Sequence, residues 1–443
     1  MRRWLVPPII GISFGFLAGC SMGAANSGNG GSGGGGNSGN PTTVTFKVTS
    51  VTPTAVATQI GTGSFSAASV ASGTLTLSIP SGTNNFAVAY ACPAATATVG
   101  NLQISAVMEN VVEATTADGT SFDLYCSPTT ASANTGILTG SVDASAISGA
   151  NYVGVAAGGG NMGNQYFLSG ASASFSKSMP AGSDRVAVGA YVETAGNQLG
   201  ANTSLTLAAV RNFDGIPVPG SLNGGNTVVL GAADAVTVQP ITYKNVPSGY
   251  MAPTTYASYS WSSGGGFQLT NNAGNQYPAV PAGAAQSGDV YFFSSMCQSS
   301  TGLPLQTSNV ETWMGTGGPL TVTFPAAWAY TGPTPAAAPV FSMAYAGFAG
   351  SGNVYYGGNL SWQAGQNASY TRSVVATAGY LNGSTTLAMP DLSAVQGFVA
   401  PPASGTSVFW TALIGQTSYP VLQSNPTSGT ASIVSSSGTF TVP

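Results

Sequence analysis

Short runs of β-forming residues recur along almost the whole chain, and they constrain its fold more than any other feature. The runs are alternating or continuously apolar, and Gly, Pro, Asn or Ser bounds them about every 8 to 12 residues. Clear examples cover residues 43–51, 74–79, 86–92, 186–192, 290–293 and 408–414. Helical periodicity is nearly absent. The sequence therefore predicts an all-β fold.

The low charge of the chain does not indicate disorder. Only 5% of the residues are charged and none is histidine, yet 43% are hydrophobic and there are 18 Tyr and 18 Phe. Disordered chains lack aromatic and β-branched residues in such numbers. We expect a folded body, and roughly 400 residues are too many for a single β-sandwich.

A short motif repeats at intervals of about 100 residues, the size of one Ig-like sandwich. A strand ends in Pro-small-Gly and an apolar strand follows; Pro80, Pro180 and Pro281 begin three copies, and Pro390 begins a looser fourth. Proline and glycine suit a tight corner between strands. The spacing predicts four sandwiches, at 42–146, 147–243, 244–334 and 335–443. The alternative is chance turns in a chain rich in Gly and Pro.

The motif resembles the Ig-like and transthyretin-like modules of bacterial surface proteins. That resemblance implies tandem Ig-like β-sandwich domains.

The N-terminus has the form of an export signal. Arg2 and Arg3 precede an uncharged apolar stretch from Trp4 to Leu17, which is shorter than the roughly 20 residues that a membrane-spanning helix needs. Leu17-Ala18-Gly19-Cys20 resembles the lipobox of bacterial lipoproteins. The resemblance implies a signal peptide at 1–19, cleaved before Cys20, which would then carry lipid, including palmitate. Ser21 implies transfer to the outer membrane or cell surface.

The segment that follows predicts a flexible tether. Residues 20–41 are mostly Gly, Ser and Asn and carry no charge. A coil of this kind spans roughly 25 Å, so it would hold the folded body away from the membrane.

Three cysteines remain if Cys20 is lipidated, in an oxidising compartment. Cys92 and Cys126 end two runs in the first predicted sandwich, so we predict a disulfide between them. Cys297 has no local partner. Burial of its thiol is favoured over an intermolecular bond.

The absence of histidine removes several kinds of chemistry. Ser-His-Asp and Cys-His catalysis and His-containing metal sites are excluded, and we predict no catalytic residue, no metal and no cofactor. Two of the eight basic residues lie in the leader, so no basic stripe is left for nucleic acid. Without histidine, the free energy of unfolding should be nearly constant between about pH 5.5 and 8.

The densest group of acids contains Glu109, Glu113, Asp118 and Asp123. A glycoside hydrolase needs two carboxyl groups about 5 to 9 Å apart. However, Asp118-Gly119 favours a hairpin that would point Glu113 and Asp123 to opposite faces. A calcium site using Asp118 and Asp123 is a further alternative.

Tryptophan and tyrosine are concentrated between residues 309 and 420, where Trp313, Trp328, Trp362 and Trp410 lie. Such residues either form a core or stack on neutral sugars. For a ligand surface we expect Trp362, Tyr355 and Tyr356, because small residues precede Trp362. Trp410 lies in an apolar run and should be in the core.

These observations favour a non-enzymatic structural, adhesive or assembly lipoprotein of the cell envelope. A carbohydrate-binding lipoprotein is the second hypothesis, and a carboxylate-dependent glycoside hydrolase is the third. The expected partners are the membrane, through the N-terminal lipid, and a neutral glycan or other envelope proteins.

Overall fold

The computed structural model describes residues 40–49, 51–99, 102–126, 135–158, 165–195, 203–300, 302–348, 353–364, 368–421 and 426–443. Cys20 and nearly all of the predicted tether lie outside these residues. The structure is 58% strand and 4% helix, so the predicted all-β sandwich fold is confirmed. They form two compact units. Among them, no helix has the length and apolar character needed to cross a membrane.

Unit 1 comprises the described parts of 1–129, 329–426 and 435–443. Its first portion contains β1 (Thr42–Val48), β2 (Ala55–Ile60), β3 (Ser66–Ala68), β4 (Thr74–Ile79), β5 (Asn85–Ala91), β6 (Ala95–Val99), β7 (Leu102–Thr115) and β8 (Ser121–Leu124). Its later portion contains β24 (Val340–Ser342), β25 (Asn353–Gln363), β26 (Ala368–Thr377), α2 (Ala378–Leu381), β27 (Thr386–Ala388) and β28 (Ser407–Thr417).

Unit 2 comprises the described parts of 130–328 and 427–434. It contains β9 (Thr135–Asp143), β10 (Tyr152–Ala157), β11 (Tyr166–Ser169), β12 (Ser172–Pro180), β13 (Gly182–Ala195), β14 (Thr203–Val218), β15 (Gly220–Ser221), η3 (Leu222–Gly225), β16 (Val228–Val229) and η4 (Ala232–Asp234). It continues with β17 (Thr237–Lys244), β18 (Thr254–Ser260), β19 (Gly266–Ala273), β20 (Gln276–Ala279), η5 (Ala282–Ala284), β21 (Val290–Gln298), β22 (Leu305–Met314) and β23 (Leu320–Thr323). The chain passes from unit 2 to unit 1 for the last time within β29 (Gly429–Thr441).

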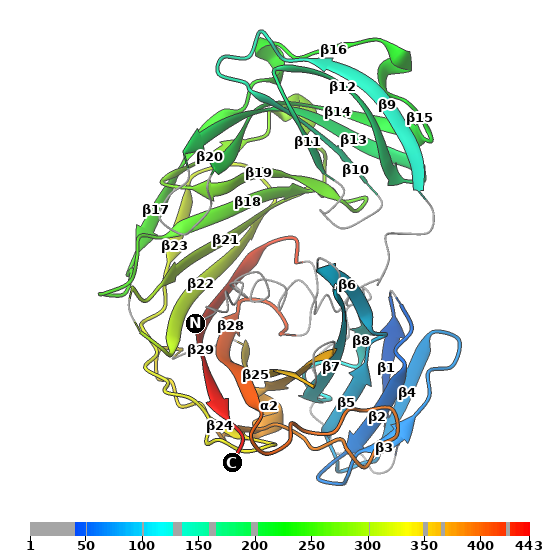
Figure 1. The fold of residues 1–443 in the computed structure, drawn as a ribbon, viewed down its shortest axis with the longest axis vertical. Coiled ribbons are helices and arrows are strands. Elements are labelled where there is room, and N and C mark those ends of the chain that lie inside the picture. Colours follow the sequence, from blue (N-terminus) through cyan, green and yellow to red (C-terminus); the bar gives the residue numbers. More distant parts are fainter. Residues whose placement is uncertain are drawn as a thin grey trace. The chain divides into compact units, whose positions relative to one another are not determined.

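One strand arrangement recurs within the units. In unit 1, β1 lies between β4 and β8 in a small sheet, and β2 lies between β3 and β5 in a larger one (Figure 1). In unit 2, β9 pairs with β12 and β15 while β10 pairs with β11 and β13. β17 pairs with β20 and β23 while β18 pairs with β19 and β21. In both arrangements of unit 2 the first, fourth and seventh strands thus share one sheet, and in unit 1 the first, fourth and eighth strands do. This order differs from the ABED and CFG sheets of an immunoglobulin constant domain.

The repeated proline motif occupies the same topological position each time. It links β4 to β5, β12 to β13, β20 to β21 and β27 to β28, where the chain crosses from the small sheet to the larger one. Gly82 and Gly182 have positive φ angles of 84° and 143°, which glycine adopts without strain. The motif is therefore a sheet-to-sheet corner.

Alternating side chains fill the space between the two sheets of each sandwich. In unit 1, Phe46, Phe86 and Phe122 come from three strands and lie within 6.0 Å of one another, measured between ring centroids. Cys92 and Cys126 form the predicted disulfide beside this core, with a Cα–Cα distance of 5.4 Å.

Each unit contains strands from more than one of the predicted sandwiches, and the division into four separate domains stays a prediction. In unit 1, β26 pairs in parallel with β7, so segments from the first and fourth predicted sandwiches share a sheet. In unit 2, β14 contacts β19 at Thr206 and Thr270, and one apolar cluster takes residues from both sandwiches.

The predicted hairpin around Asp118-Gly119 is wrong. β7 pairs with β5 and β26, while β8 pairs with β1 in the other sheet. The Asp118 carboxylate accepts hydrogen bonds from the backbone N–H and the hydroxyl of Thr115, at 2.8 Å each, and from the Thr377 hydroxyl at 2.7 Å. These bonds stabilise a turn that carries the chain to the opposite sheet.

Candidate functional site

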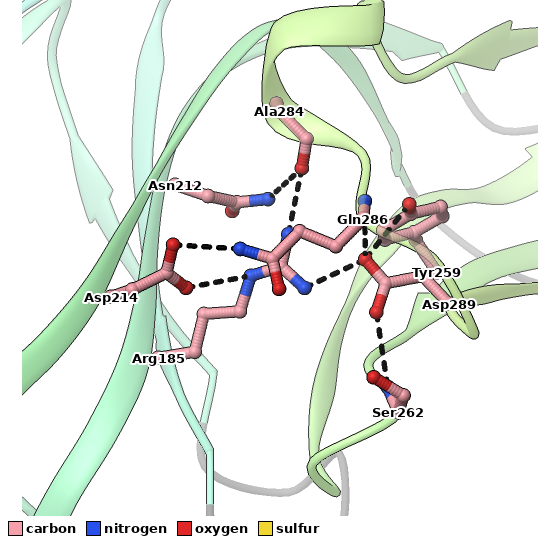
Figure 2. A network of polar contacts seen from close by, with 8 residues as sticks. All are labelled: Arg185, Asn212, Asp214, Tyr259, Ser262, Ala284, Gln286 and Asp289. Atoms are coloured by element: carbon pink, nitrogen blue, oxygen red, sulfur yellow. Dashed lines mark hydrogen bonds and ion pairs between the residues drawn. The ribbon is translucent and has the colours of Figure 1, made fainter.

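A buried arginine network connects the two sandwiches of unit 2. Arg185, at 6% exposure, lies on β13 and donates to the Asp289 carboxylate at 2.6 Å and to the Ala284 carbonyl at 2.8 Å. Its Nε also lies 3.4 Å from the Asp214 carboxylate. The guanidinium carbon lies 5.4 Å from the centre of the Trp261 ring. Figure 2 shows Arg185 and Asp214 on the strands of one sandwich meeting Ala284 and Asp289 from the corner segment of the other.

Asp289 is held by more than the arginine. Its carboxylate accepts from the Tyr259 hydroxyl and from the backbone N–H groups of Ser262 and Gln286, each at 3.0 Å (Figure 2). The Gln286 side-chain amide in turn donates to Asp214 at 2.7 Å. A buried charge is tolerated when it is paired and its remaining lone pairs are hydrogen-bonded. Both conditions hold here, so the network fixes one sandwich against the other.

A second buried arginine plays the corresponding part in unit 1. Arg372 on β26 and Glu109 on β7 are each 2% exposed and lie 2.6 Å apart. Arg372 also donates to the carbonyls of Pro390 and Val399, and the Val399 N–H donates to Glu109 at 2.6 Å. The ion pair therefore secures both the parallel β7–β26 contact and the corner segment that follows β27.

Sequence reasoning missed these networks, although one signal was present. Arg185 begins the apolar run Val186-Ala187-Val188, and Arg372 precedes Val374 and Val375. An arginine beside an apolar strand in a chain with so few charges indicates a buried ion pair. The sequence does not identify the acidic partners, which lie 104 and 263 residues away.

The structure contradicts the expected exposure of the predicted aromatic surface. Trp362 and Tyr355 are each 5% exposed, and Tyr356 is half-buried. The Trp362 ring packs 5.7 Å from Tyr370. Trp410 is 3% exposed, as predicted for a core residue.

The physical reason lies in the glycines that were expected to admit a ligand. A Cβ atom on Gly358 would lie 3.0 Å from the Phe341 ring, and one on Gly357 would lie 2.8 Å from Leu413. The small residues therefore admit side chains of the same unit, and these close the surface.

Two acids of the densest group, Glu109 and Glu113, do not form a paired catalytic site in unit 1. Glu109 is neutralised by Arg372. Glu113, four residues along the same strand, lies about 13 Å away along the strand axis, beyond the separation used by glycoside hydrolases. Burial raises the pKa of Glu113 to about 7. Among the described residues, no group of three or more His, Cys, Asp or Glu could hold a metal ion.

Cys297 has the environment expected for an inert thiol. It is free and buried in the core of unit 2, and burial raises its pKa to about 12. The nucleophilic thiolate is therefore disfavoured at neutral pH. The prediction that this cysteine is buried is confirmed.

The hollows found in unit 2 are small. One, of about 200 Å³, is lined by Arg211, Asn212, Asp234 and Ala284, beside the Arg185 network. Another, of about 290 Å³, lies on the outer face of β9 and β12. Typical ligand sites are clefts of roughly 300 to 1,000 Å³, so neither hollow has the size of a substrate cleft.

Comparison with known proteins yields little. No protein-family model matches the sequence, and the search of curated proteins found no match. One similar solved structure is a proposed adhesin from Bacteroides ovatus. It is 11% identical, and the match covers 37% of this chain and 72% of that chain with a TM-score of 0.12. An overlap of this size carries no argument about function, which therefore rests on the chain's own residues.

Proposed function

We propose that this protein is a non-enzymatic lipoprotein of the cell envelope, anchored through lipid on Cys20, whose β-sandwiches serve as a rigid structural or adhesive body at the cell surface. The observation that carries the proposal is the use of buried charge. In each unit an arginine–carboxylate pair joins two sandwiches. Buried ion pairs between sandwiches stiffen a scaffold, and their charged groups are not available for catalysis.

Two further features support an exported protein. The disulfide between Cys92 and Cys126 suits an oxidising compartment. The leader and the lipobox-like segment supply the route and the attachment point.

Metabolic labelling with palmitate tests the anchor. The wild-type protein should take up label, and Cys20→Ser should abolish it. Cys297→Ser is the matched control, because a buried thiol should not accept lipid and its loss should leave the label unchanged. Label that persists in Cys20→Ser would refute the lipoprotein assignment.

Protease treatment of intact cells tests the location. A surface protein should be degraded from outside, whereas a protein that faces the periplasm should be protected until the outer membrane is opened. Protection in intact cells would exclude the adhesive role and leave a structural role inside the envelope.

A further inference from the structure

The larger sheet of the second sandwich in unit 2 has an outer face that combines aromatic and polar side chains. On β21, Tyr291, Phe293 and Cys297 point into the apolar core. Side chains alternate along a strand, so Phe292 and Ser294 lie on the opposite face. Strand register places Trp313 and Glu311 of β22 beside them. Tyr256 of β18 lies across from Ser294 on the other side.

We call this set of residues the β21 outer face: Tyr256, Phe292, Ser294, Asn309, Glu311 and Trp313.

An aromatic pair forms one end of the β21 outer face. The rings of Phe292 and Trp313 lie 5.1 Å apart, inclined at 48°. Both residues are half-buried. Trp313 is an exception, because Trp261, Trp328, Trp362 and Trp410 are at most 5% exposed. Of the tryptophans in the described residues, Trp313 is therefore the one that a solute can best reach.

Hydrogen-bonding groups lie directly beside the rings. The Ser294 hydroxyl donates to the Asn309 side-chain oxygen at 3.2 Å, and the Asn309 side chain is in turn hydrogen-bonded to the Glu311 carboxyl group. Glu311 lies between Asn309 and Trp313 on the same strand face. The face thus has a hydroxyl and an amide next to aromatic carbon, and the Glu311 carboxyl group beside them is buried at 9% exposure.

The charged residues of β18, β21 and β22 limit the class of ligand that this face can bind. β18, β21 and β22 contain no lysine or arginine, and their one acidic residue is Glu311. Without a cation, the face cannot neutralise phosphate, sulfate or an acidic polysaccharide. A neutral sugar has an apolar ring face, which packs on aromatic rings, and hydroxyl groups, which bond to amides and carboxylates.

We propose that the β21 outer face binds a neutral glycan, with Trp313 and Phe292 as the stacking platform and Ser294 and Asn309 as hydrogen-bonding groups. The proposal rests on the adhesive part of the proposed function and names the class of ligand. It is independent of the lipid anchor.

Tryptophan fluorescence gives a direct readout on the full-length protein purified in detergent. Acrylamide should quench the wild-type protein more than Trp313→Phe, because the other described tryptophans are buried. Addition of a soluble neutral polysaccharide, from a set of dextran, a β-glucan and a galactomannan, should protect Trp313 from acrylamide. Polygalacturonate, an acidic polysaccharide, should give no protection. Protection by the acidic polymer alone, or by none, would overturn the proposal.

Retardation in native gels containing the protective polymer tests the individual residues. Trp313→Ala and Phe292→Ala should each weaken binding by about tenfold or more, whereas Trp313→Phe keeps a ring and should lose less. Phe348→Ala is the matched control, because it removes a half-buried ring from an aromatic pair with Tyr345 in unit 1. Wild-type retardation in Trp313→Ala and Phe292→Ala would refute the assignment.

Two checks keep the outcomes separable. Near-ultraviolet circular dichroism shows whether each variant is folded. If Trp313→Ala unfolds, the retardation of Asn309→Ala and the protection of wild-type Trp313 from acrylamide still test whether this face binds the glycan. Palmitate labelling of the same preparations tests the anchor. A folded, labelled protein that binds no neutral polymer would overturn the glycan proposal and leave the lipoprotein assignment intact.

Discussion

At the scale of the residue, several of the few charged side chains of this protein form ion pairs, and two of the arginines in these pairs are buried. All three arginines beyond the leader are in ion pairs with carboxylates. Arg185 and Arg372 are almost completely buried, whereas the Arg211 side chain is 40% exposed. A surface ion pair contributes about 0 to 1 kcal/mol, but removal of one partner of a buried pair leaves an uncompensated charge. The difference in burial between Arg372 and Arg211 can be tested by comparing the same substitution at both positions.

Arg372→Met should lower the free energy of unfolding by about 3 to 5 kcal/mol, because Glu109 loses its counter-charge inside the protein. Arg211→Met should cost less than Arg372→Met, because the Arg211 side chain is 40% exposed and water partly screens its pair with Asp234, which is 9% exposed. Chemical denaturation at neutral pH measures both. Equal losses in the two variants would mean that the burial of Arg372 does not determine its contribution.

Buried carboxyl groups overturn the expectation of a pH-independent stability. That expectation considered only histidine, but burial raises the pKa of Glu113 and of Glu311 to about 7 from an ordinary 4.5. Between about pH 4.5 and 7, a glutamate in the unfolded chain is ionised, whereas Glu113 and Glu311 keep their protons in the folded protein. The unfolded state therefore binds fewer protons, and stability falls as pH rises.

Glu113→Gln isolates this effect. The raised pKa of Glu113 should cost the wild-type protein about 2 kcal/mol between pH 5.5 and 8. The glutamine variant cannot ionise, so it should lose that part of the slope and keep the part due to Glu311. Denaturant midpoints measured across this pH range check the result. An unchanged slope in Glu113→Gln would show that this carboxyl group is ionised in the folded protein.

At the scale of the element, sequence patterns identified strands well and their partners poorly. The run at 86–92 became β5, and the proline motif became a corner each time, because both depend on local residue type. The hairpin at Asp118-Gly119 was wrong because β7 pairs with β5 and β26 and β8 pairs with β1, and local residue type does not indicate these partners. The exposure of Trp362 was mispredicted because glycines can admit a side chain as readily as a ligand.

The paired strands β10 and β13 show a glycine contact that the sequence pattern does not reveal. Gly154 lies opposite Gly189 in the register, and the Tyr191 ring lies against both. The Tyr191 hydroxyl accepts from the Gln165 amide and donates to the Gln268 carbonyl, each at 2.7 Å. Because Gly154 and Gly189 have no side chains, the Tyr191 ring has room to extend from β13 to β19.

Gly154→Ala should therefore destabilise unit 2 by about 1 to 3 kcal/mol, because its Cβ would overlap the Tyr191 ring. Gly231→Ala is the control: a Cβ there meets no atom within 4 Å, and its φ of −138° suits any residue. Thermal unfolding compares the two variants. A neutral Gly154→Ala would show that the sheet adjusts without displacing Tyr191.

At the scale of the whole molecule, the repeat in the sequence predicts how many sandwiches to expect but not how they associate within a unit. A sandwich of about 100 residues follows from strand spacing and corner motifs, which are local. The association depends on single side chains such as Arg185 and Asp289, whose pairing no spacing indicates. The pairing of sandwiches into units is thus a property that only the folded structure shows.

Because Arg185 and Asp289 belong to different sandwiches of unit 2, their network should make the two sandwiches open together. In the wild-type protein, the slowest-exchanging amides of β13 and of β21 should report one shared opening free energy in native-state hydrogen exchange. Arg185→Met leaves Asp289 buried without its counter-charge. The amides of β21 should then exchange at least about tenfold faster relative to those of β13, because the corner segment that carries Asp289 is no longer fixed. Asp143→Asn, an exposed acid on β9 of the same unit, should leave the ratio unchanged. If β13 and β21 stay equally protected in Arg185→Met, then the shared apolar cluster, rather than the arginine, couples the two sandwiches.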